Sequence, residues 1–403
     1  MPVFFLLSGY SLALTYGRTK YESNTRSCCT SPIEGGEDKR VLFKTFNFYR
    51  NRFARTMPVY YISNFVLGLS AYFFAFGTRA FSNVNAMWMF VASVINSLFP
   101  VGMILPGMMM PMVAPGWAIS TLWFFYIVFP FLLPRLQQHS DNACSKNIVA
   151  LSWMQLFLTV ALGVVFQFIR IPVFFPLEPF RGGYWGYWVS MGWGVSRLPV
   201  FLMGVVAGLR RLRHEENSDM LQQNQLANFI NAFVPFRFGA KSKVENPEHK
   251  WSVLVNIISI SHLFLIVASA SLGVVNGAIP WFINWGMNTI AVYSQLVVIE
   301  GLTRDGGKSL LARVCRLKIT QELGTASMSL YLIHEPLQKW VGYAIAKVRG
   351  ESLVWYMDKI QMTPTTPLWG LLIVLVLSPF LAWLLTKWVE DPLRKALRAA
   401  QKT

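Results

Sequence analysis

The residues best able to take part in a reaction lie together in an otherwise apolar stretch. His334 follows Ser329 and Tyr331. In a helix, Tyr331 and His334 would share one face because they are three positions apart. An ionisable side chain inside an apolar helix is a functional candidate, and an imidazole can take the proton of a hydroxyl group. The pattern favours a His that lines a site over a structural His, and it supports a catalytic base less strongly.

Arg52 and Arg55 form a second candidate group. Their spacing places both side chains on one face of a helix. A guanidinium group offers a planar fork of donors that matches a phosphate group. Two interpretations stand at this point: a phosphate-binding pair, or the ordinary basic charge that flanks a membrane span on its cytoplasmic side.

Two further pairs of candidate residues lie at the ends of apolar runs. Trp117 and Ser120 open the run 117–136. They could line a site, or the Trp could anchor a helix at the membrane interface. Glu390 and Arg394 flank Pro392 beyond the last apolar run. A structural cap or ion pair explains this pair better than catalysis does.

Metal and cofactor sites are not supported by residue spacing. The five His include no pair four positions apart and no ligand spacing with Cys or carboxylate residues, and the four Cys include no C-x-x-C. Neither a G-x-S-x-G elbow nor a phosphate-binding glycine loop occurs. His262 lies in the middle of an apolar run and is interpreted as structural. We therefore predict no metal and no bound cofactor.

The elements that must position these residues are predicted to be membrane helices. Hydrophobic residues make up 54% of the 403-residue chain and charged residues only 14%, which is too apolar a composition for a water-soluble domain. Several runs exceed the roughly 20 residues that cross a bilayer core. Nine spans are predicted, near residues 2–17, 56–78, 117–136, 147–170, 193–210, 251–274, 279–302, 320–345 and 367–389.

Two details refine this span prediction. The stretch 84–106 is interrupted by Asn96, Pro100 and Pro106, so it is predicted to be re-entrant or to lie in the interface. Within 2–17, Ser8 and Gly9 would let two helix backbones approach closely.

Basic residues set the predicted orientation. Although the net charge is +17, the Lys and Arg residues gather in four segments: nine in 18–55, seven in 210–250, five in 303–319 and five in the tail from Lys387, against seven in the intervening loops. The positive-inside rule places the four segments in the cytoplasm. Topology therefore accounts for the charge, and no nucleic-acid partner is predicted.

Domain organisation follows from the same pattern. The polar loops, about 18–55 and 211–250, lack the hydrophobic content of a separate domain. One domain is therefore predicted over 1–403. Because the span count is odd and Met1 falls on the non-cytoplasmic side, we expect that one helix precedes this sequence.

Five short blocks resemble, in order, motifs of the acyltransferase 3 family of membrane-bound O-acyltransferases, which includes O-antigen acetylases. They cover nearly the whole chain. The blocks are Phe4–Tyr10 (FFLLSGY), Tyr49–Tyr61 (YRNRFARTMPVYY), Gly116–Pro130 (GWAISTLWFFYIVFP), Leu323–Pro336 (LGTASMSLYLIHEP) and Trp388–Arg394 (WVEDPLR).

The resemblance implies an all-α fold, a polytopic helix bundle in the lipid bilayer, and an O-acyltransferase activity. The co-substrate would be cytoplasmic acyl-CoA, the transferred group an acyl group with acetyl as first choice, and the acceptor a hydroxyl of a sugar or another membrane-associated molecule. Arg52 and Arg55 would hold the phosphates of the donor. The substrate site would be lined by Trp117, Ser120, Ser329 and Tyr331.

Two departures from the family pattern leave an alternative open. The family's first helix carries an Arg and a His regarded as the catalytic base, and this sequence begins after it, which leaves His334 as the candidate base. Leu122 stands where the family has Glu. The alternative is a catalytically inactive, transporter-like or binding protein of the same fold.

Overall fold

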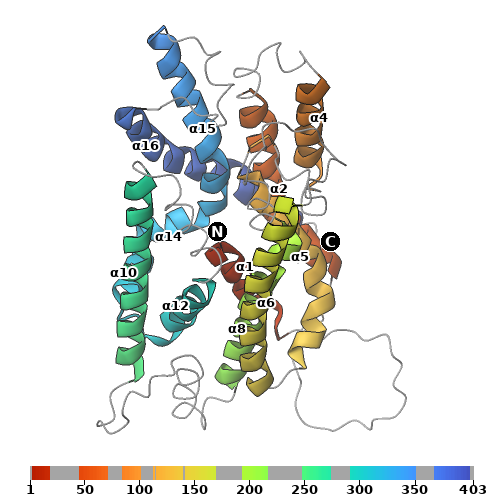
Figure 1. Ribbon diagram of the computed structural model, residues 1–403, viewed down its shortest axis with the longest axis vertical. Coiled ribbons are helices and arrows are strands. Elements are labelled where there is room, and N and C mark those ends of the chain that lie inside the picture. The colour runs from red at the N-terminus through yellow and green to blue at the C-terminus, as the bar shows by residue number, and fades with distance from the viewer. Residues whose placement is uncertain are drawn as a thin grey trace. The chain divides into compact units, whose positions relative to one another are not determined.

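The residues that the structure describes form helices and no strands. The structure is a computed structural model that describes residues 2–18, 45–70, 84–100, 112–113, 115–138, 141–168, 193–216, 247–273, 291–350 and 367–399. In chain order (Figure 1) the elements are α1 (Pro2–Tyr16), α2 (Thr45–Tyr61), the π-helix η1 (Ile62–Gly68), α4 (Val84–Leu98), α5 (Gly116–Gln137), α6 (Asp141–Phe168), α8 (Gly194–Glu216), α10 (Pro247–Gly273), α12 (Val292–Arg304), α13 (Leu310–Arg316), α14 (Lys318–Thr325), α15 (Ser327–Val348), α16 (Leu368–Leu385), the π-helix η7 (Thr386–Glu390) and α17 (Asp391–Ala399).

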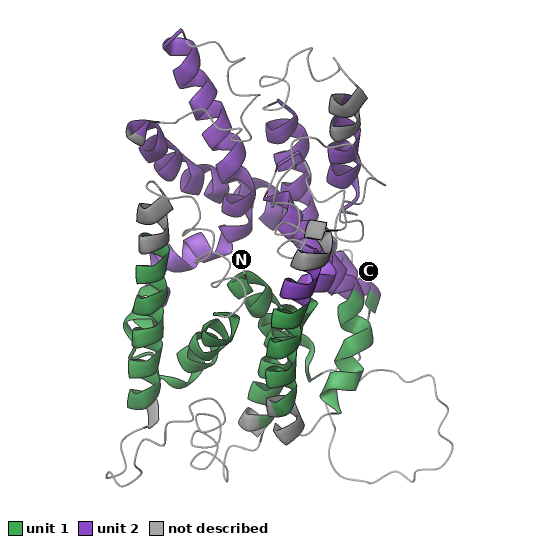
Figure 2. Ribbon diagram, in the orientation of Figure 1, with its two compact units in different colours: residues 1–45, 128–157, 197–314 green, residues 46–127, 158–196, 315–403 purple. Residues whose placement is uncertain are grey.

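The chain divides into two compact units (Figure 2). Unit 1 comprises residues 1–45, 128–157 and 197–314, and unit 2 comprises residues 46–127, 158–196 and 315–403. Helices α5 and α6 each contribute to both units. The prediction of a single domain over the whole chain stays a prediction.

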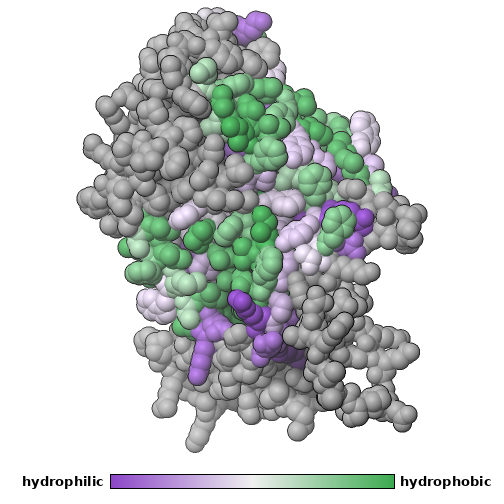
Figure 3. Space-filling view, turned by 90° about the vertical axis from the view of Figure 1, so that its right-hand side faces the viewer, coloured by the Kyte–Doolittle hydropathy of each residue, from purple (hydrophilic) through white to green (hydrophobic). Residues whose placement is uncertain are grey.

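Several described helices have the properties of membrane spans. Three are long and apolar enough to cross a bilayer: Gly116–Gln137, His249–Val267 and Trp369–Ala396. Their outward side chains include Phe264, which is 70% exposed, and Val376, which is 71% exposed. Figure 3 shows broad apolar areas on the face that it presents. Such surfaces are stable against lipid and unfavourable in water. The protein is an integral membrane protein, and the count of nine spans stays a prediction.

The structure corrects three predicted boundaries. The last part of the polar loop 18–55 is helical, because α2 begins at Thr45. The loop 211–250 is shorter than predicted, since α8 continues to Glu216 and α10 begins at Pro247. The predicted span 320–345 is divided into α14 and α15 at Ala326. Lys, Arg and Glu are good helix formers, so hydropathy alone predicted the starts of α2 and α10 too late and the end of α8 too early.

Helices α1 and α8 of unit 1 pack backbone against backbone. A Cβ on Gly9 would collide with the carbonyl oxygen of Phe201, and a Cβ on Gly204 would collide with that of Leu6. Gly208, one turn after Gly204, would bring a Cβ within 2.8 Å of the Tyr10 carbonyl oxygen. The close helix contact predicted from Gly9 is therefore confirmed, and its partner is a small-xxx-small pair on α8.

In unit 2, α15 packs against α16 around a small apolar core. Ala326, Ile333 and Ala382 are fully buried there, and Leu67 of η1 packs against them. Helix α15, which carries three of the predicted site residues, is thus held in place by side chains from η1 and α16.

Candidate functional site

All the residues predicted to form the site lie in unit 2, on α2, α5 and α15. The structure brings Arg52 of α2 and Ser120 of α5 into one interface. It places the α15 residues against η1 and η7 instead, where the C-terminal motif also lies.

The interface between α2 and the first half of α5 is antiparallel. Residue numbers rise along α2 as their partners fall along α5. The contacts are Tyr49 Oη to the Ile127 carbonyl oxygen at 3.1 Å, Arg52 over the Tyr126 ring at 5.8 Å, Trp123 Nε1 to Thr56 Oγ1 at 3.2 Å, and Tyr60 with Ser120.

This pairing separates two of the predicted site residues. Tyr60 is eight positions after Arg52, which is a rise of about 12 Å along the helix, and Ser120 pairs with Tyr60. Ser120 is buried and Trp117, at the start of α5, is half-buried. Arg52 and Ser120 therefore occupy different depths of one interface.

Arg52 is half-buried in an aromatic cradle. Its guanidinium carbon lies 5.6 Å from the ring centre of Phe48 and 5.8 Å from that of Tyr126. The two rings meet edge to face at 6.2 Å, so each fixes the position of the other. Cation–π contact holds the guanidinium in place while its edge stays able to donate hydrogen bonds.

Arg55 has a different environment from Arg52. Its side chain is exposed, and it interacts electrostatically with Glu390 of η7. Glu390 is only 2% exposed, and its Oε2 accepts no hydrogen bond from the residues that the structure describes. The structure thus links the second and fifth sequence motifs through opposite charges.

Sequence reasoning missed Arg50, two residues before Arg52. The Nε and Nη2 atoms of Arg50 are buried and have no hydrogen-bond partner within the described part of the chain. Its guanidinium carbon lies 5.9 Å from the ring of Phe46. Buried donors without acceptors are costly, so Arg50 is suited to bind an anion. Its position in the YRNR sequence was the available signal.

Sequence reasoning also missed Asn64, which ties α2 and η1 to α4. Asn64 Oδ1 accepts hydrogen bonds from Ser97 Oγ at 3.1 Å and from the Val113 amide at 3.0 Å. Its Nδ2 donates to the Tyr60 carbonyl oxygen at 2.8 Å. Asn64 is fully buried. A polar amide within an apolar run needs such partners, and this is the signal that could have found it.

His334 is half-buried on α15, with its ring turned toward its own helix. Nδ1 lies 2.7 Å from the carbonyl oxygen of Tyr331. A carbonyl oxygen only accepts, so Nδ1 carries the proton and Nε2 of the neutral ring keeps its lone pair. The Tyr331 ring lies 5.9 Å away at an interplanar angle of 40°, which confirms their predicted shared face. This tautomer is the one that a general base at Nε2 requires.

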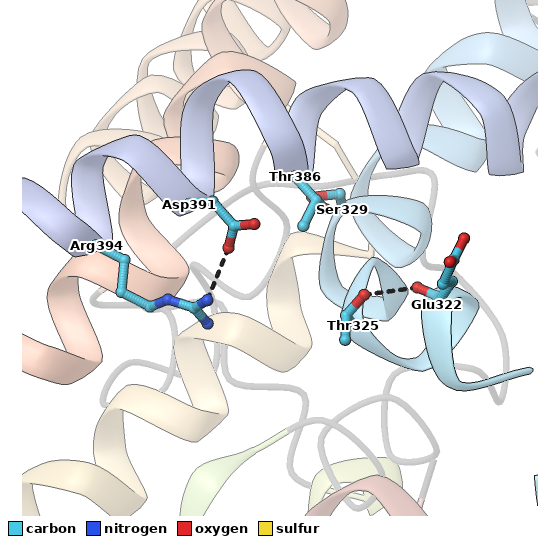
Figure 4. A network of polar contacts seen from close by, with 6 residues as sticks. All are labelled: Glu322, Thr325, Ser329, Thr386, Asp391 and Arg394. Atoms are coloured by element: carbon cyan, nitrogen blue, oxygen red, sulfur yellow. Dashed lines mark hydrogen bonds and ion pairs between the residues drawn. The ribbon is translucent and has the colours of Figure 1, made fainter. Parts of the chain in front are cut away.

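Ser329 connects α15 to η7. Its hydroxyl accepts a hydrogen bond from Thr386 Oγ1 at 3.1 Å, and both residues are buried (Figure 4). Further along the same helix, Arg394 pairs with Asp391 at 2.7 Å. The close ion pair of Arg394 is therefore with Asp391, three positions earlier, while Glu390, four positions earlier, interacts with Arg394 electrostatically.

An apolar cavity of about 300 Å³ lies between η1, α15, α16 and η7. Its lining is entirely apolar and includes Ile62, Leu67, Ile333, Leu337 and Trp388. Both π-helical stretches contribute to it, and Ile333 directly precedes His334. The cavity can accept hydrocarbon but offers no polar partner to a charged group.

His262 has the structural role that the sequence predicted. Its Nε2 lies 2.9 Å from Ser294 Oγ in unit 1, which joins α10 to α12. No group of three His, Cys, Asp or Glu residues suited to a metal ion occurs among the described residues. Whether the protein uses a metal or cofactor stays a prediction.

Comparison with known proteins gives one match. A model of the acyltransferase 3 family, described as an acyltransferase domain, matches residues 1–387. No curated protein and no solved structure matches the chain. The matched range includes every residue of the site described above except the C-terminal Trp388–Arg394 motif. A helical membrane protein matched over nearly its whole length in this way is a membrane acyltransferase, and the chain belongs to the acyltransferase 3 family.

Proposed function

We propose that the protein transfers an acyl group from acyl-CoA to a hydroxyl group of a membrane-associated acceptor, a sugar in the first instance. The observation that carries the proposal is the arrangement at the start of α2. Three guanidinium groups lie within six residues, Arg52 is held by two aromatic rings, and Arg50 has buried donors that find no acceptor among the described residues. The phosphate groups of CoA match these donors in charge and geometry.

The direction of α2, from the arginines toward the apolar cavity, suggests where the thioester of the donor would lie. From Arg55 to Ile62, the first η1 residue at the apolar cavity, the helix rises about 10 Å. The pantetheine arm of acyl-CoA would follow this path from the phosphates toward α15. The thioester would then lie on the side of unit 2 where Ile333 and His334 are found.

The proposed reaction is a direct acyl transfer. Nε2 of His334 takes the proton of the acceptor hydroxyl as the oxygen attacks the thioester carbonyl carbon. The tetrahedral intermediate then breaks its carbon–sulfur bond, and the departing CoA thiolate takes up the proton from the imidazolium. The products are the ester and free CoA, with His334 restored. Tyr331 orients the imidazole through its carbonyl group, and holding both substrates side by side lowers the entropic barrier.

Acetyl is the acyl group proposed. The cavity beside Ile333 provides a direct test of this choice, because a long acyl chain would fill it and an acetyl group would not. Replacing Leu337 with Trp would narrow the cavity. For an acetyl donor we expect kcat/KM to change by no more than about threefold, since no contact with the short group is lost. A large loss would show that the cavity holds the donor.

One observation favours the alternative of a binding protein without catalysis. Leu122, at the position of the family's Glu, is 1% exposed in the apolar interior of α5, so this position supplies no carboxylate.

One assay separates the acyltransferase from a binding protein without catalysis. The 403-residue chain would be purified into phosphatidylcholine nanodiscs, and thiol release from acetyl-CoA would be followed with a panel of sugar acceptors. Acceptor-dependent thiol release that is lost in His334→Gln supports the transferase. Binding of acetyl-CoA without any turnover, at any acceptor, would establish the binding protein instead.

A further inference from the structure

The apolar cavity of unit 2 is left without an occupant by the proposed reaction, because an acetyl group would not fill it. Its volume is about 300 Å³, and every residue that lines it is apolar. A cavity of roughly 150 Å³ holds a benzene ring, so this one accommodates a chain of roughly twelve carbon atoms. Burying a sugar or a phosphate group there would leave its polar atoms without partners. The cavity therefore suits a hydrocarbon chain.

The cavity is lined by one face of each helix that borders it. On α15 the lining residues are Ile333, Leu337 and Trp340, which are four and three positions apart. The lining residues of α16 and η7 have the same spacing, and they are Leu381, Leu384, Leu385, Trp388 and Val389. Both π-helical stretches that the structure describes, η1 and η7, contribute. Because π-helical turns occur frequently at functional sites, a binding site explains the cavity better than a packing defect does.

The cavity reaches the lipid-facing surface of the unit. Trp388 lines it, and the same side chain is 74% exposed. Trp388 and α16 belong to the apolar helix Trp369–Ala396, which is long enough to cross a bilayer. The outward residues Leu375 and Val376 of this helix are 68% and 71% exposed. A hydrocarbon chain can therefore pass from the bilayer into the cavity without contact with water.

The α15 side of the cavity adjoins the proposed base. His334 lies three positions before Leu337, and side chains at this spacing are neighbours on a helix surface. The ring is held by the contact of Nδ1 with the Tyr331 carbonyl oxygen at 2.7 Å. A molecule whose chain fills the cavity would keep its polar end outside the apolar lining. That polar end would then lie beside the imidazole.

We propose that the cavity holds the hydrocarbon tail of the acceptor, which is a lipid with a hydroxylated head group. This inference rests on the proposed acetyl transfer at His334, whose bond changes stay as given above. The tail would fix the head group at the edge of the cavity, where one hydroxyl meets Nε2. Tail binding would thereby lower the entropic cost of bringing that hydroxyl to the thioester. The product would be the acetylated lipid.

Photochemical labelling tests the tail site without requiring turnover. The probe is dodecyl β-D-glucoside with a diazirine near the end of its chain, added to the protein in phosphatidylcholine nanodiscs. A phosphatidylcholine with a diazirine in its acyl chain is the comparison, and labelled residues are identified by mass spectrometry. The variants are Leu337→Trp, which narrows the cavity, and Leu375→Trp, which adds the same side chain to the outward face of α16.

The glucoside should label cavity-lining residues of α15 and α16 in the wild type and in Leu375→Trp. Leu337→Trp should reduce this labelling about tenfold, because atoms forced into an occupied space are costly. The phosphatidylcholine probe should label the outward face of α16 instead. Equal labelling of the cavity by both probes would show that it holds any bilayer lipid, which would overturn the acceptor assignment. Glucoside labels found only outside the cavity would overturn the site, and this result needs no variant to fold.

Acetyl transfer supplies the second arm of the test. The kcat/KM values for methyl and dodecyl β-D-glucoside are measured with acetyl-CoA in the same nanodiscs. The ratio of the dodecyl to the methyl value cancels a general loss of activity, and comparing proteins cancels the partitioning of the longer glucoside into the disc. Leu337→Trp should lower this ratio about tenfold, and Leu375→Trp should keep the wild-type ratio.

The two arms separate failure of this proposal from failure of the proposed function. Cavity labelling by the glucoside without acetyl transfer to any acceptor would support the tail site and refute the transferase. Acetyl transfer with equal ratios in all three proteins would support the transferase and overturn the tail site.

Discussion

The indole nitrogen of Trp123 donates a hydrogen bond to the hydroxyl of Thr56 at 3.2 Å, and that hydroxyl donates to the Arg52 carbonyl oxygen at 2.9 Å. This chain of two bonds connects α5 to the turn of α2 that carries Arg52. Thr56 is fully buried, so neither bond is exposed to competition from water.

Breaking this connection should destabilise the α2–α5 interface. We expect Thr56→Val or Trp123→Phe alone to reduce the free energy of unfolding by about 0.6–2 kcal/mol. The double variant should lose less than the sum of the two, because both remove the same bond. The free energies of unfolding of the wild type, the two single variants and the double variant would be measured in mixed detergent micelles. A coupling energy of zero would mean that this bond does not contribute to the interface.

The arginines of α2 provide a test of donor binding. Arg52→Ala and Arg50→Ala should each raise the KM for acetyl-CoA about tenfold or more, through the loss of charge-assisted hydrogen bonds to phosphate. Arg52→Lys should recover little of this, because an ammonium group lacks the planar fork that stacks between Phe48 and Tyr126. Initial rates at varied acetyl-CoA would give both constants. Arg316→Ala, an exposed charge in the same unit, is the control, and an equal KM for all four proteins would contradict the assignment.

A substitution at His334 can separate its hydrogen bond to the Tyr331 carbonyl oxygen from its proposed role as the base. Gln can donate to the Tyr331 carbonyl oxygen as Nδ1 does, but it cannot take up a proton. His334→Gln should therefore lower kcat by about 100-fold or more while KM for acetyl-CoA stays within a few-fold. His262→Gln is the matched control, because His262 also lies in an apolar helix but contacts only Ser294 among the contacts described above. Unchanged kcat in His334→Gln would exclude it as the base.

The glycines of the two units should respond in opposite directions. Gly204→Ala would drive a Cβ into the Leu6 carbonyl oxygen, so we expect loss of folded protein or a large decrease in thermal stability. Gly324 of α14 has no atom within 4 Å of an added Cβ. Gly324→Ala should therefore raise stability by roughly 0.5–1 kcal/mol through helix propensity. Thermal unfolding in detergent would compare them, and a tolerated Gly204→Ala would show that α1 and α8 pack less closely than described.

Cys315 offers a direct test of orientation. It is exposed, with a free thiol, and it lies in the basic segment 303–319. In a variant that retains only this cysteine, an impermeant maleimide should label the protein from the cytoplasmic side alone. Right-side-out and inverted vesicles provide the comparison. Labelling from the opposite side would reverse the predicted topology of this segment and of the arginines that adjoin it.

Sequence reasoning succeeded where local composition carries the information. The apolar runs predicted helices at α5, α10 and α16 because lipid demands unbroken stretches of apolar residues with satisfied backbone groups. The shared face of Tyr331 and His334 followed from helix periodicity alone. The sequence did not reveal Arg50 or Asn64 as candidates, because their importance depends on which neighbours bury them.

The sequence by itself determined the helical membrane class, the membership in the acyltransferase 3 family and the residue types at the candidate site. Only the tertiary structure decided that the Arg52 guanidinium lies against the rings of Phe48 and Tyr126, and that Arg55 interacts electrostatically with Glu390. It also decided that Arg394 pairs with Asp391. Hydropathy and periodicity are properties of neighbouring residues, whereas the burial of a charge and the choice of its partner depend on helices that meet only after packing.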